Sequence, residues 1–351
     1  MPIAQYLLFG GSSSERLVSV ATAQHMARVL QGATCYFWRS DGSVSEVTHE
    51  SLVQFERPFE EPFVGHEKRR FDSLGALVDS LPTEDGVFVL GLHGKGGEDG
   101  RLQEFFETKK IAFTASDSFA SKNSFDKIRA KSMVASVGLK VAPSHTLTAE
   151  SVGLIQEALQ QWGPVVVKPA EDGSSEGLFF VKESESLSAA QTYVQGHPQT
   201  TFLVERQIRG RELTVGVWDS PEGLQALPAT EVDLDPGRVF DFAGKYLGAG
   251  VRELTPAPIE DGLLAQLQEQ ALIAHRTLGA FGYSRTDFIW DGDDIYFLEL
   301  NTLPGLTVAS FIPQQLDAAG ISMQSFLDQQ VHLAWSRREG VAESSPSPNA
   351  S

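Results

Sequence analysis

Cysteine and positive charge are both scarce in this chain. Cys35 is the only cysteine among 351 residues, which excludes an internal disulfide framework and favours a reducing compartment, the cytoplasm. Acidic residues outnumber basic ones by 46 to 28, and the formal net charge is −18. Nucleic-acid partners are therefore not expected, because they bind basic surfaces. The charge does not limit the choice of a small substrate, since a basic pocket can lie inside an acidic protein.

Long apolar runs are absent as well. No stretch approaches the length needed to cross a membrane, and the N-terminal sequence MPIAQYLLFGG lacks the basic flank and apolar run of a signal peptide. We therefore expect a soluble cytoplasmic protein without a membrane partner. The opening also lacks the GxxxxGK[ST] and GxGxxG spacings, so it predicts neither a P-loop nor a dinucleotide fingerprint. The length allows two or three domains.

The first third of the chain contains two strand–glycine–helix units. Residues 6–9 predict an apolar strand followed by GGSSS and a helix at about 15–30; residues 87–92 predict a buried strand that runs into HGKGGEDG and a helix at 101–109. Loops at the carboxyl ends of such strands bind ligands in α/β proteins. Glu15 could instead only compensate the helix dipole, and His93 could be an ordinary loop histidine.

The segments around these units carry weaker signals. Residues 40–80 are poorly periodic and predict a variable connection with one helix at 71–81. Residues 115–122 are rich in serine and predict a link at a domain boundary. The helix predicted at 123–137 carries Lys127 and Lys131 among other charges, most of which we expect to be solvated at the surface.

A second informative stretch is GPVVVKPAEDGSSEG at 163–177. It predicts a strand ending at Lys168, a Gly/Ser loop and a return strand at 178–181. Such a loop can fold over phosphates through its N–H and hydroxyl groups, and the lysine can reach the same phosphates. Alone, the stretch fits a plain hairpin better. Glu205 ends the next predicted strand and could accept hydrogen bonds from adenine or ribose, or be an edge charge.

The most unusual stretch is GYSRTDFIWDGDDIYFLELNTLPGLTVAS at 282–310. It predicts two strands, 285–290 and 295–301, joined by an Asp/Gly turn. Asp287, Glu299 and Asn301 lie among aromatic and aliphatic residues, where an unpaired carboxylate is costly. These groups therefore need a cation or good hydrogen bonds. An ordinary cluster of ion pairs at a sheet end is the alternative.

The register of this hairpin decides between the two interpretations. If Asp291 pairs with Ile295 across a three-residue loop, Asp287 lies opposite Glu299 and Arg285 lies beside them. The result would be an oxygen-rich site for a hard cation such as Mg²⁺. A four-residue loop would put the pairs on opposite faces, so an odd-length loop or a bulge between Trp290 and Ile295 is required.

The remaining segments complete the outline. FDFAGKYLGAG at 240–250 suits a loop that covers a site, residues 260–278 predict a long helix, and residues 311–338 are predicted to be largely helical.

Taken in order, these stretches resemble the D-alanine–D-alanine ligases of the ATP-grasp superfamily, over nearly the whole chain up to about residue 338. The motifs that carry the resemblance are GSSSERLVS (11–19), HGKGGEDGRLQ (93–103), Asp126-Lys127, VKPAEDGSSEG (167–177), Glu205, RELTVGV (211–217), Lys245-Tyr246, Arg285-Thr286-Asp287 and ELNTLPGLT (299–307). The chain departs from the usual pattern at Glu171, Asp172 and Glu176 in the phosphate loop.

The resemblance implies an α/β fold with α+β elements, in which two antiparallel sheets hold the nucleotide and a parallel α/β domain precedes them. The implied domains are an N-terminal substrate domain (1–115), a central ATP-grasp lobe (116–210), a C-terminal lobe with the metal and oxyanion site (211–338) and a disordered tail (339–351). A homodimer is also implied.

The activity implied is ATP-dependent joining of two D-alanines through an acyl phosphate, for peptidoglycan precursor synthesis. Two Mg²⁺ ions, for which Mn²⁺ could substitute, would assist ATP as the co-substrate. A D-alanine–D-lactate or D-alanine–D-serine ligase on the same scaffold, a ligase for other amino acids and a non-catalytic nucleotide-binding partner protein are the alternatives. Within the family, a tyrosine at Tyr246 favours an amine as the second substrate.

The resemblance also assigns residue roles. Catalytic roles fall on Glu15, Ser174, Tyr246, Arg285 and the N–H of Gly305. Substrate binding falls on Glu15, Val18, His93, Arg285, Gly305 and Ser310. ATP binding falls on Lys127, Lys168, Ser174, Glu205, Ile208, Glu212, Lys245, Leu298 and Glu299. The metal ligands are Asp287, Glu299 and Asn301.

Overall fold

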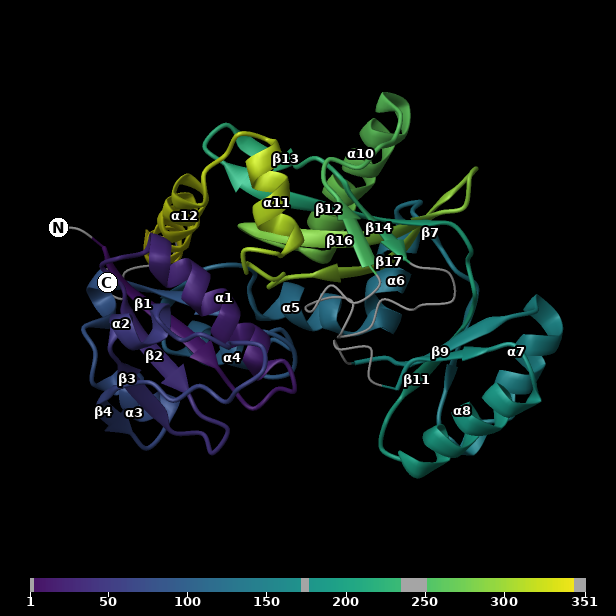
Figure 1. Cartoon of the computed structure of the whole chain (residues 1–351), viewed down its shortest axis with the longest axis horizontal. Helices are drawn as coiled ribbons and strands as arrows, with labels where there is room; N and C mark the ends of the chain where they lie inside the picture. Colours follow the sequence, from purple (N-terminus) through teal and green to yellow (C-terminus); the bar gives the residue numbers. More distant parts are fainter. Residues whose placement is uncertain (1–2, 172–176, 235–250, 344–351) are drawn as a thin grey trace, which may run out of the picture.

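The computed structural model describes residues 3–171, 177–234 and 251–343, and it contains three sheets with helices packed against them (Figure 1). No helix in these ranges is both long and apolar enough to span a membrane. Ser174, Lys245 and Tyr246 lie outside the described residues, as does the whole of the covering loop predicted at 240–250.

The N-terminal sheet has six strands in the order β4-β3-β2-β1-β5-β6. Their bounds are β1 Ala4–Gly10, β2 Thr34–Trp38, β3 Val44–Val47, β4 Glu67–Phe71, β5 Gly86–Gly91 and β6 Ala112–Phe113. Strands β2, β1, β5 and β6 are parallel, as expected, whereas β3 and β4 add antiparallel pairs at one edge. The domain predicted as parallel is therefore mixed.

The variable connection predicted at 40–80 is wrong, because β3, the short helix α2 (His49–Val53) and β4 lie there. The helix predicted at 71–81 is shorter, α3 (Leu74–Asp79), and a 3-10 turn follows at Thr83–Asp85. Strand β4 has four exposed residues, EKRR, before the buried Phe71. Charged side chains of this kind protect an edge strand from pairing with other chains, and they hide its strand pattern.

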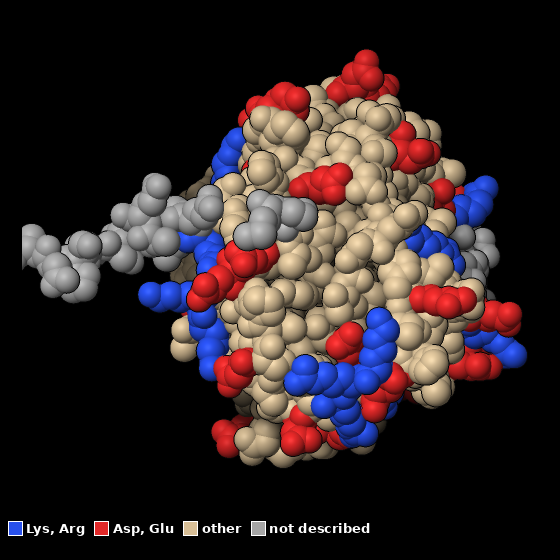
Figure 2. Space-filling model, turned by 90° about the vertical axis from the view of Figure 1, so that its left-hand side faces the viewer, with Lys and Arg blue, Asp and Glu red and all other residues tan. Residues whose placement is uncertain are grey.

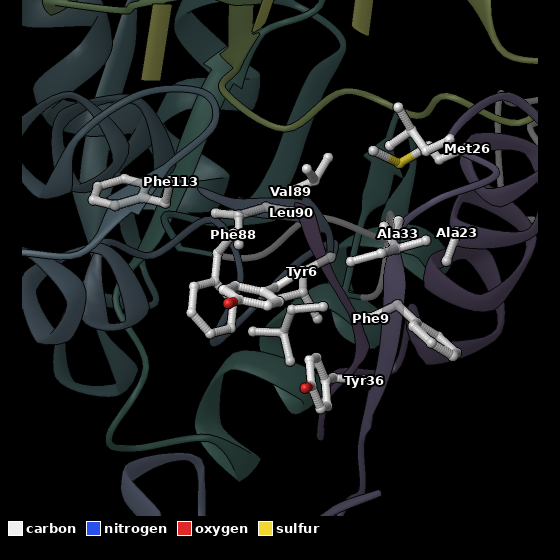
Figure 3. Close-up of a cluster of buried hydrophobic side chains, with 14 of the residues drawn as sticks. Tyr6, Phe9, Ala23, Met26, Ala33, Tyr36, Phe88, Val89, Leu90 and Phe113 are labelled. Atoms are coloured by element: carbon white, nitrogen blue, oxygen red, sulfur yellow. The ribbon is translucent and has the colours of Figure 1, made fainter. Parts of the chain in front are cut away.

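The two predicted strand–helix units are confirmed. Helix α1 (Arg16–Val29) follows β1, and α4 (Arg101–Thr108) follows β5 and its glycine loop. Aromatic and aliphatic side chains around the sheet form a common core, in which the ring centres of Tyr6 and Phe88 lie 5.3 Å apart and Phe9 lies to one side of them (Figure 3). This core fixes the carboxyl ends of β1 and β5 side by side, which places both glycine loops at one edge.

Helix α12 (Met323–Glu343) joins the end of the chain to this first sheet (Figure 1). It packs on β5 and β6, and the Arg337 guanidinium donates to the carbonyls of Phe113 and Ala115 at 2.7 and 3.0 Å. The helix continues to Glu343, so the first five residues of the tail expected at 339–351 are helical.

Two helices occupy the region where a link and one helix were predicted. They are α5 (Ser118–Phe125) and α6 (Lys127–Ser136). The break comes at Asp126, whose backbone is extended. Its carboxylate caps α6 by accepting hydrogen bonds from the N–H groups of Ile128 and Arg129. The predicted single helix at 123–137 is thus wrong at this position.

The central sheet is antiparallel and has the order β10-β9-β11-β8. Its strands are β8 Ser144–Leu147, β9 Val165–Pro169, β10 Phe179–Val181 and β11 Phe202–Arg206, with helices α7 (Leu154–Trp162) and α8 (Ser184–Gly196) packed on it and a 3-10 turn at Ala149–Ser151. The hairpin around the Gly/Ser loop is confirmed, since Phe179 pairs with Val167.

The C-terminal sheet has seven strands. The strands are β7 Lys140–Val141, β12 Arg211–Ser220, β13 Gly223–Ala226, β14 Thr230–Leu234, β15 Val251–Leu254, β16 Tyr283–Trp290 and β17 Ile295–Asn301. All their pairs are antiparallel except that of β17 with β7. The long helix predicted at 260–278 is α10 (Asp261–Leu278), which ends at Gly279 in the left-handed region, and α11 (Phe311–Ala318) precedes α12.

The β16–β17 hairpin has the predicted pairing but not the predicted loop. Trp290 pairs with Ile295, so the loop comprises the four residues 291–294. A β-bulge then shifts the register, because Phe288 pairs with Phe297 and Asp287 with Glu299, which leaves Leu298 as the extra residue. The bulge was expected between Trp290 and Ile295 but lies inside the ladder, and it returns Asp287 and Glu299 to opposite positions.

Candidate active site

A pocket lies where the N-terminal glycine loops meet the C-terminal sheet, with about 860 Å³ of empty space that includes open solvent. It is lined by Glu15, His93, Glu98, Ser124, Phe125, Lys127, Glu253, Arg285, the segment 299–305 and the segment 309–311. Eight predicted site residues meet here: Glu15, His93, Lys127, Arg285, Glu299, Asn301, Gly305 and Ser310. Segments nearly 300 residues apart in sequence thus form one site.

Asp287 is the best-connected carboxylate beside the pocket. Arg285 donates to it through Nε and Nη2, both at 2.8 Å, in a fork-to-fork pair. The Thr214 hydroxyl on the neighbouring strand β12 donates to Oδ1 at 2.6 Å, and the Asn301 amide donates to Oδ2 at 3.3 Å. The bulge makes this cluster possible because it brings β17 into register with Arg285 and Asp287.

The oxygen atoms of Asp287, Glu299 and Asn301 are the donors available for a metal ion at this end of the pocket. No group of three or more His, Cys, Asp or Glu side chains suited to a metal ion occurs within the described ranges. Asp287 and Glu299 lie opposite each other, and Asn301 adds an amide oxygen. Mg²⁺ is commonly held by one or two carboxylates together with substrate phosphates and water, so this small oxygen set fits such an ion when a nucleotide is bound.

The other end of the pocket carries Glu15 and His93. Glu15 is buried just before α1, and a Cβ on Gly94 would lie 2.5 Å from its carboxylate oxygen, so only glycine allows this approach. His93 bridges the Thr22 hydroxyl at 2.7 Å and the Leu303 carbonyl at 2.9 Å. Burial lowers the pKa of His93 to about 4, against the effect of the Leu303 carbonyl, so the ring is neutral near pH 7.

Glu98 is a carboxyl group that the sequence analysis did not single out. It accepts a hydrogen bond from the Gly94 N–H at 2.8 Å. Burial and then the nearby charge of Glu15 raise the pKa of Glu98 to about 8. At neutral pH this group is therefore largely protonated and adds little negative charge to the Glu15 end.

A buried trio of charges lies between the central and C-terminal sheets. Glu205 on β11 is 2.7 Å from the Lys168 ammonium on β9 and 2.8 Å from the Lys131 ammonium on α6. Burial alone would raise the pKa of Glu205, but the two lysines outweigh it and lower the pKa to about 2. Glu299 and Glu212 also act on Lys168, so predicted nucleotide residues gather at one place.

The prediction that most charges of α6 are solvated is wrong for its two lysines, Lys127 and Lys131, which are buried. Lys131 is 4% exposed, and Lys127 is 9% exposed with its ammonium 3.5 Å from Glu299. Burial lowers the pKa of Lys131, although Glu205 opposes this shift. The signal in the sequence is helical spacing, because both lysines share the buried face of α6 with Ala130 and Val134.

The loop from 301 to 310 forms the wall below Arg285. A Cβ on Gly305 would lie 2.6 Å from the Ser310 hydroxyl, so glycine is required for this close packing. Ser310 precedes α11 and accepts from the Thr307 N–H at 3.1 Å. The backbone N–H of Gly305 and the start of α11 therefore belong to the same wall as the Arg285 guanidinium.

Glu253 on β15 is a further lining residue that the sequence analysis did not identify. Its Oε2 accepts from the Gln314 amide at 2.6 Å. Burial raises the pKa of Glu253, whereas the Gln314 bond and the Arg285 charge lower it. This half-buried carboxyl group enters the pocket from a strand that no predicted motif covered.

Several predicted residues do not line this pocket. Val18 is fully buried in α1, and Leu298 is the bulge residue of β17. Lys168 belongs to β9 and Glu205 to β11. Ile208 lies in the segment between β11 and β12, and Glu212 lies in β12. The pocket therefore brings most predicted amino-acid residues together with Lys127, Glu299 and Asn301, whereas Val18, Asp287 and the other predicted ATP residues that the structure describes lie outside its lining.

Comparisons with known proteins give the family of the chain. The D-ala D-ala ligase N-terminus profile matches residues 5–116, and the D-ala D-ala ligase C-terminus profile matches residues 133–332. The D-alanine–D-alanine ligase of Desulfotalea psychrophila is 34% identical over 337 residues, 95% of each chain. That of Leptospira biflexa is 40% identical over 336 residues, 91% of this chain and 95% of its own.

Solved structures share the fold. The crystal structure of the VanG D-Ala:D-Ser ligase from Enterococcus faecalis superposes with a TM-score of 0.78 at 26% identity, covering 95% of this chain and all of its own. The two family profiles together span most of the sequence, and the relatives match from end to end. The chain belongs to the D-alanine–D-alanine ligase family, with the ATP-grasp fold.

Proposed function

We propose that this protein joins two molecules of D-alanine to D-alanyl-D-alanine with the conversion of ATP to ADP and phosphate, as a step in peptidoglycan precursor synthesis in the cytoplasm. The observation that carries the proposal is the cluster of Arg285, Asp287, Glu299 and Asn301, of which Arg285, Glu299 and Asn301 line the same pocket as Glu15 and His93. Its charges suit a reaction between a carboxylate and a triphosphate.

In the proposed reaction the carboxylate of the first D-alanine attacks the γ-phosphate of ATP and forms an acyl phosphate and ADP. Glu15 receives the ammonium of this first substrate, with His93 and Val18 shaping the subsite. The amine of the second D-alanine then attacks the acyl carbon, and the tetrahedral intermediate releases phosphate. Arg285 and the Gly305 N–H hold the developing oxyanion, where stabilisation of charge is most effective.

The nucleotide is proposed to lie between the central and C-terminal sheets. Lys127 and Lys168 contact the phosphates, Glu205 and Glu212 serve the adenine and ribose end, and Ile208 and Leu298 give apolar contacts. Lys245 is assigned to the same nucleotide, and Ser174 and Tyr246 are assigned to closure over the site. Two Mg²⁺ ions, or Mn²⁺, held by Asp287, Glu299 and Asn301 would neutralise the transferring phosphoryl group.

The domain division and assembly remain part of the proposal. We assign residues 1–115 to the substrate domain, 116–210 to the central lobe and 211–338 to the C-terminal lobe. The three buried clusters of apolar side chains support three units, although the first cluster includes α11 and α12. We also propose a homodimer, which sedimentation of the purified protein would test.

The test of the function is phosphate release from the purified protein with Mg-ATP. D-alanine alone should support release with D-alanyl-D-alanine as the product, and L-alanine should not. Mixtures of D-alanine with D-lactate or D-serine identify the alternative ligases through the mass of the product. Release with L-alanine but not with D-alanine would refute the proposal.

A further inference from the structure

Two D-alanine molecules bring two ammonium groups into the pocket, and Glu15 accounts for one of them. The pocket lining contains three more carboxyl groups, Glu98, Glu253 and Glu299. Glu98 is largely neutral near pH 7 and lies beside Glu15. Glu299 is paired with Lys127 and faces Asp287. Glu253 is the remaining carboxyl group of the pocket lining, and it has no role in the proposed reaction so far.

The position of Glu253 is fixed relative to the wall around Ser310. The Gln314 amide donates both to Glu253 Oε2 at 2.6 Å and to the Ala309 carbonyl at 2.8 Å. One side chain therefore links the carboxylate to the residue before Ser310. The Arg285 guanidinium lies 5.4 Å from the centre of the Phe311 ring, at the start of α11, and its charge also acts on Glu253.

The second oxygen of this carboxylate is available for a ligand. Within residues 3–171, 177–234 and 251–343, no group donates a hydrogen bond to Glu253 Oε1, whereas Oε2 is held by Gln314. The side chain is half-buried and borders the pocket. A fixed carboxylate with one open oxygen beside a cavity is suited to receive a cationic group from a small molecule.

The proposed chemistry brings the second ammonium to this wall. If Arg285 holds the oxygen of the carbonyl under attack, the attacking nitrogen must come within about 3–3.5 Å of the same carbon. The family resemblance implies that Ser310 contacts the carboxylate of that second amino acid. Its amine thus lies between the Ser310 wall and Arg285, on the side that Glu253 borders.

We infer that Glu253 binds the ammonium of the second D-alanine and holds its nitrogen beside the acyl carbon, which the neutral amine attacks once the ammonium has released a proton to solvent. This inference rests on the proposed function. The interaction is a charge-assisted hydrogen bond in a partly desolvated site, where such bonds are stronger than at the surface. It gives the two amino-acid subsites separate carboxylates, Glu15 for the donor and Glu253 for the acceptor, and it favours an amine over a hydroxy acid as acceptor.

The test uses Glu253→Gln, because glutamine keeps an oxygen that accepts from Gln314 and removes only the charge. Initial rates over a wide range of D-alanine concentrations give separate KM values for the two amino-acid sites. We expect the second KM to rise about 10- to 100-fold, as for the loss of a charged hydrogen bond, with the first KM nearly constant. Glu260→Gln, at an exposed position before α10, is the matched control.

A second measurement separates positioning from a general loss of activity. Hydroxylamine is largely uncharged above neutral pH and can take the place of the second amine, giving a hydroxamate. The ratio of dipeptide to hydroxamate should fall at least about 10-fold in Glu253→Gln. Equal changes in both KM values, or an unchanged ratio, would overturn the inference. Absence of dipeptide from the wild-type protein would instead refute the proposed function.

Discussion

Arg285 has two roles that use the same guanidinium: it binds the Asp287 carboxylate, and it is proposed to hold the oxyanion. In the structure two of its N–H groups are bound to Asp287 at 2.8 Å, and the residue also lines the pocket. The fork geometry lets the same residue orient a carboxylate and still present a donor to an oxyanion. The pair with Asp287 is therefore best understood as a means of fixing the guanidinium plane.

Replacing Arg285 by alanine should lower kcat about 100- to 1,000-fold, the effect of losing an oxyanion donor. Arg285→Lys keeps the charge but not the fork, so its activity should lie between those of the wild type and the alanine variant. Arg276→Ala, at an exposed position of α10, is the control. The account is wrong if Arg285→Ala has a native circular dichroism spectrum and near-normal turnover.

Glu98 predicts a pH dependence of stability. Its pKa is about 8 in the folded protein and 4.5 for an unperturbed side chain, so the folded state binds more protons between these values. Stability should thus fall as the pH rises through this window, by up to about 1.4 kcal/mol per pH unit. His93 has the opposite effect only at lower pH, because its pKa falls from 6.5 to about 4.

Between pH 6.5 and 8 the contribution of Glu98 can therefore be measured separately. The melting temperature of the wild type should decrease relative to that of Glu98→Gln across this range. Glu104→Gln, on the exposed face of α4, should follow the wild type. Parallel profiles for the wild type and Glu98→Gln would show that Glu98 is ionised in the folded state.

Helix α6 connects two sheets through one face. Lys127 reaches Glu299 on β17, and Lys131 reaches Glu205 on β11. The helix thus holds carboxylates of the C-terminal and central sheets at a fixed separation, across the place proposed for ATP. Its start is set by the Asp126 cap, which directs both lysines inward.

Lys131→Met should raise the KM for ATP about 10-fold, because Glu205 would keep only the Lys168 partner and lose its fixed orientation. Unfolding should also become easier by about 1–3 kcal/mol, the cost of a lost buried polar partner. Lys182→Met, at an exposed site in the central lobe, is the matched control. An unchanged KM for ATP in a folded Lys131→Met protein would remove Lys131 from the nucleotide site.

The turn after β1 depends on glycine. Gly10 has φ +101°, and a Cβ there would lie 2.4 Å from the Trp38 carbonyl. Gly42 has a similar φ of +86° but nothing within 4 Å of its Cβ position. Gly42→Ala should cost about 1 kcal/mol of unfolding free energy from backbone strain, and Gly10→Ala about 1–3 kcal/mol more from overpacking. Equal losses in urea titrations of the two variants would contradict this.

Much of the order of strands and helices could be predicted, because local sequence patterns indicate these elements. Apolar strands bounded by glycine, as at β1, β5 and β9, and the long periodic helix α10 need no information from elsewhere in the chain. The bulge at Leu298 could not be located, because it depends on which residues of β16 lie opposite. The opposition of Asp287 and Glu299 was predicted from the need to compensate carboxylates, not from the loop.

Some residues of the site could be predicted from the sequence and others could not, for a similar reason. Glu15, His93 and Arg285 belong to motifs that the family resemblance identifies. Glu98 and Glu253 become buried only when distant segments pack beside them, such as the Leu303 loop and Gln314, and no local pattern carries that information. Lys131 was predictable from helical spacing, but a lysine on a helix is more often solvated.

At the scale of the molecule, the first and last segments of the chain are packed together. Arg337 and Arg338 of α12 bind carbonyls of the N-terminal unit, and the pocket lies between that unit and the C-terminal sheet. On the face shown in Figure 2, acidic side chains are spread widely, and the largest group of lysines and arginines lies near the lower edge with acidic residues among them. The lysines proposed for the triphosphate, Lys127 and Lys168, have side chains that are only 11% and 15% exposed.

The most direct test of the account follows the oxygen that the proposed reaction transfers. D-alanine labelled with ¹⁸O in its carboxylate is incubated with the protein and Mg-ATP, and the phosphate and dipeptide are analysed by mass spectrometry. Attack of the carboxylate on the γ-phosphate predicts one ¹⁸O atom in each phosphate released, together with ADP and D-alanyl-D-alanine. Unlabelled phosphate, or label in AMP instead, would contradict the account.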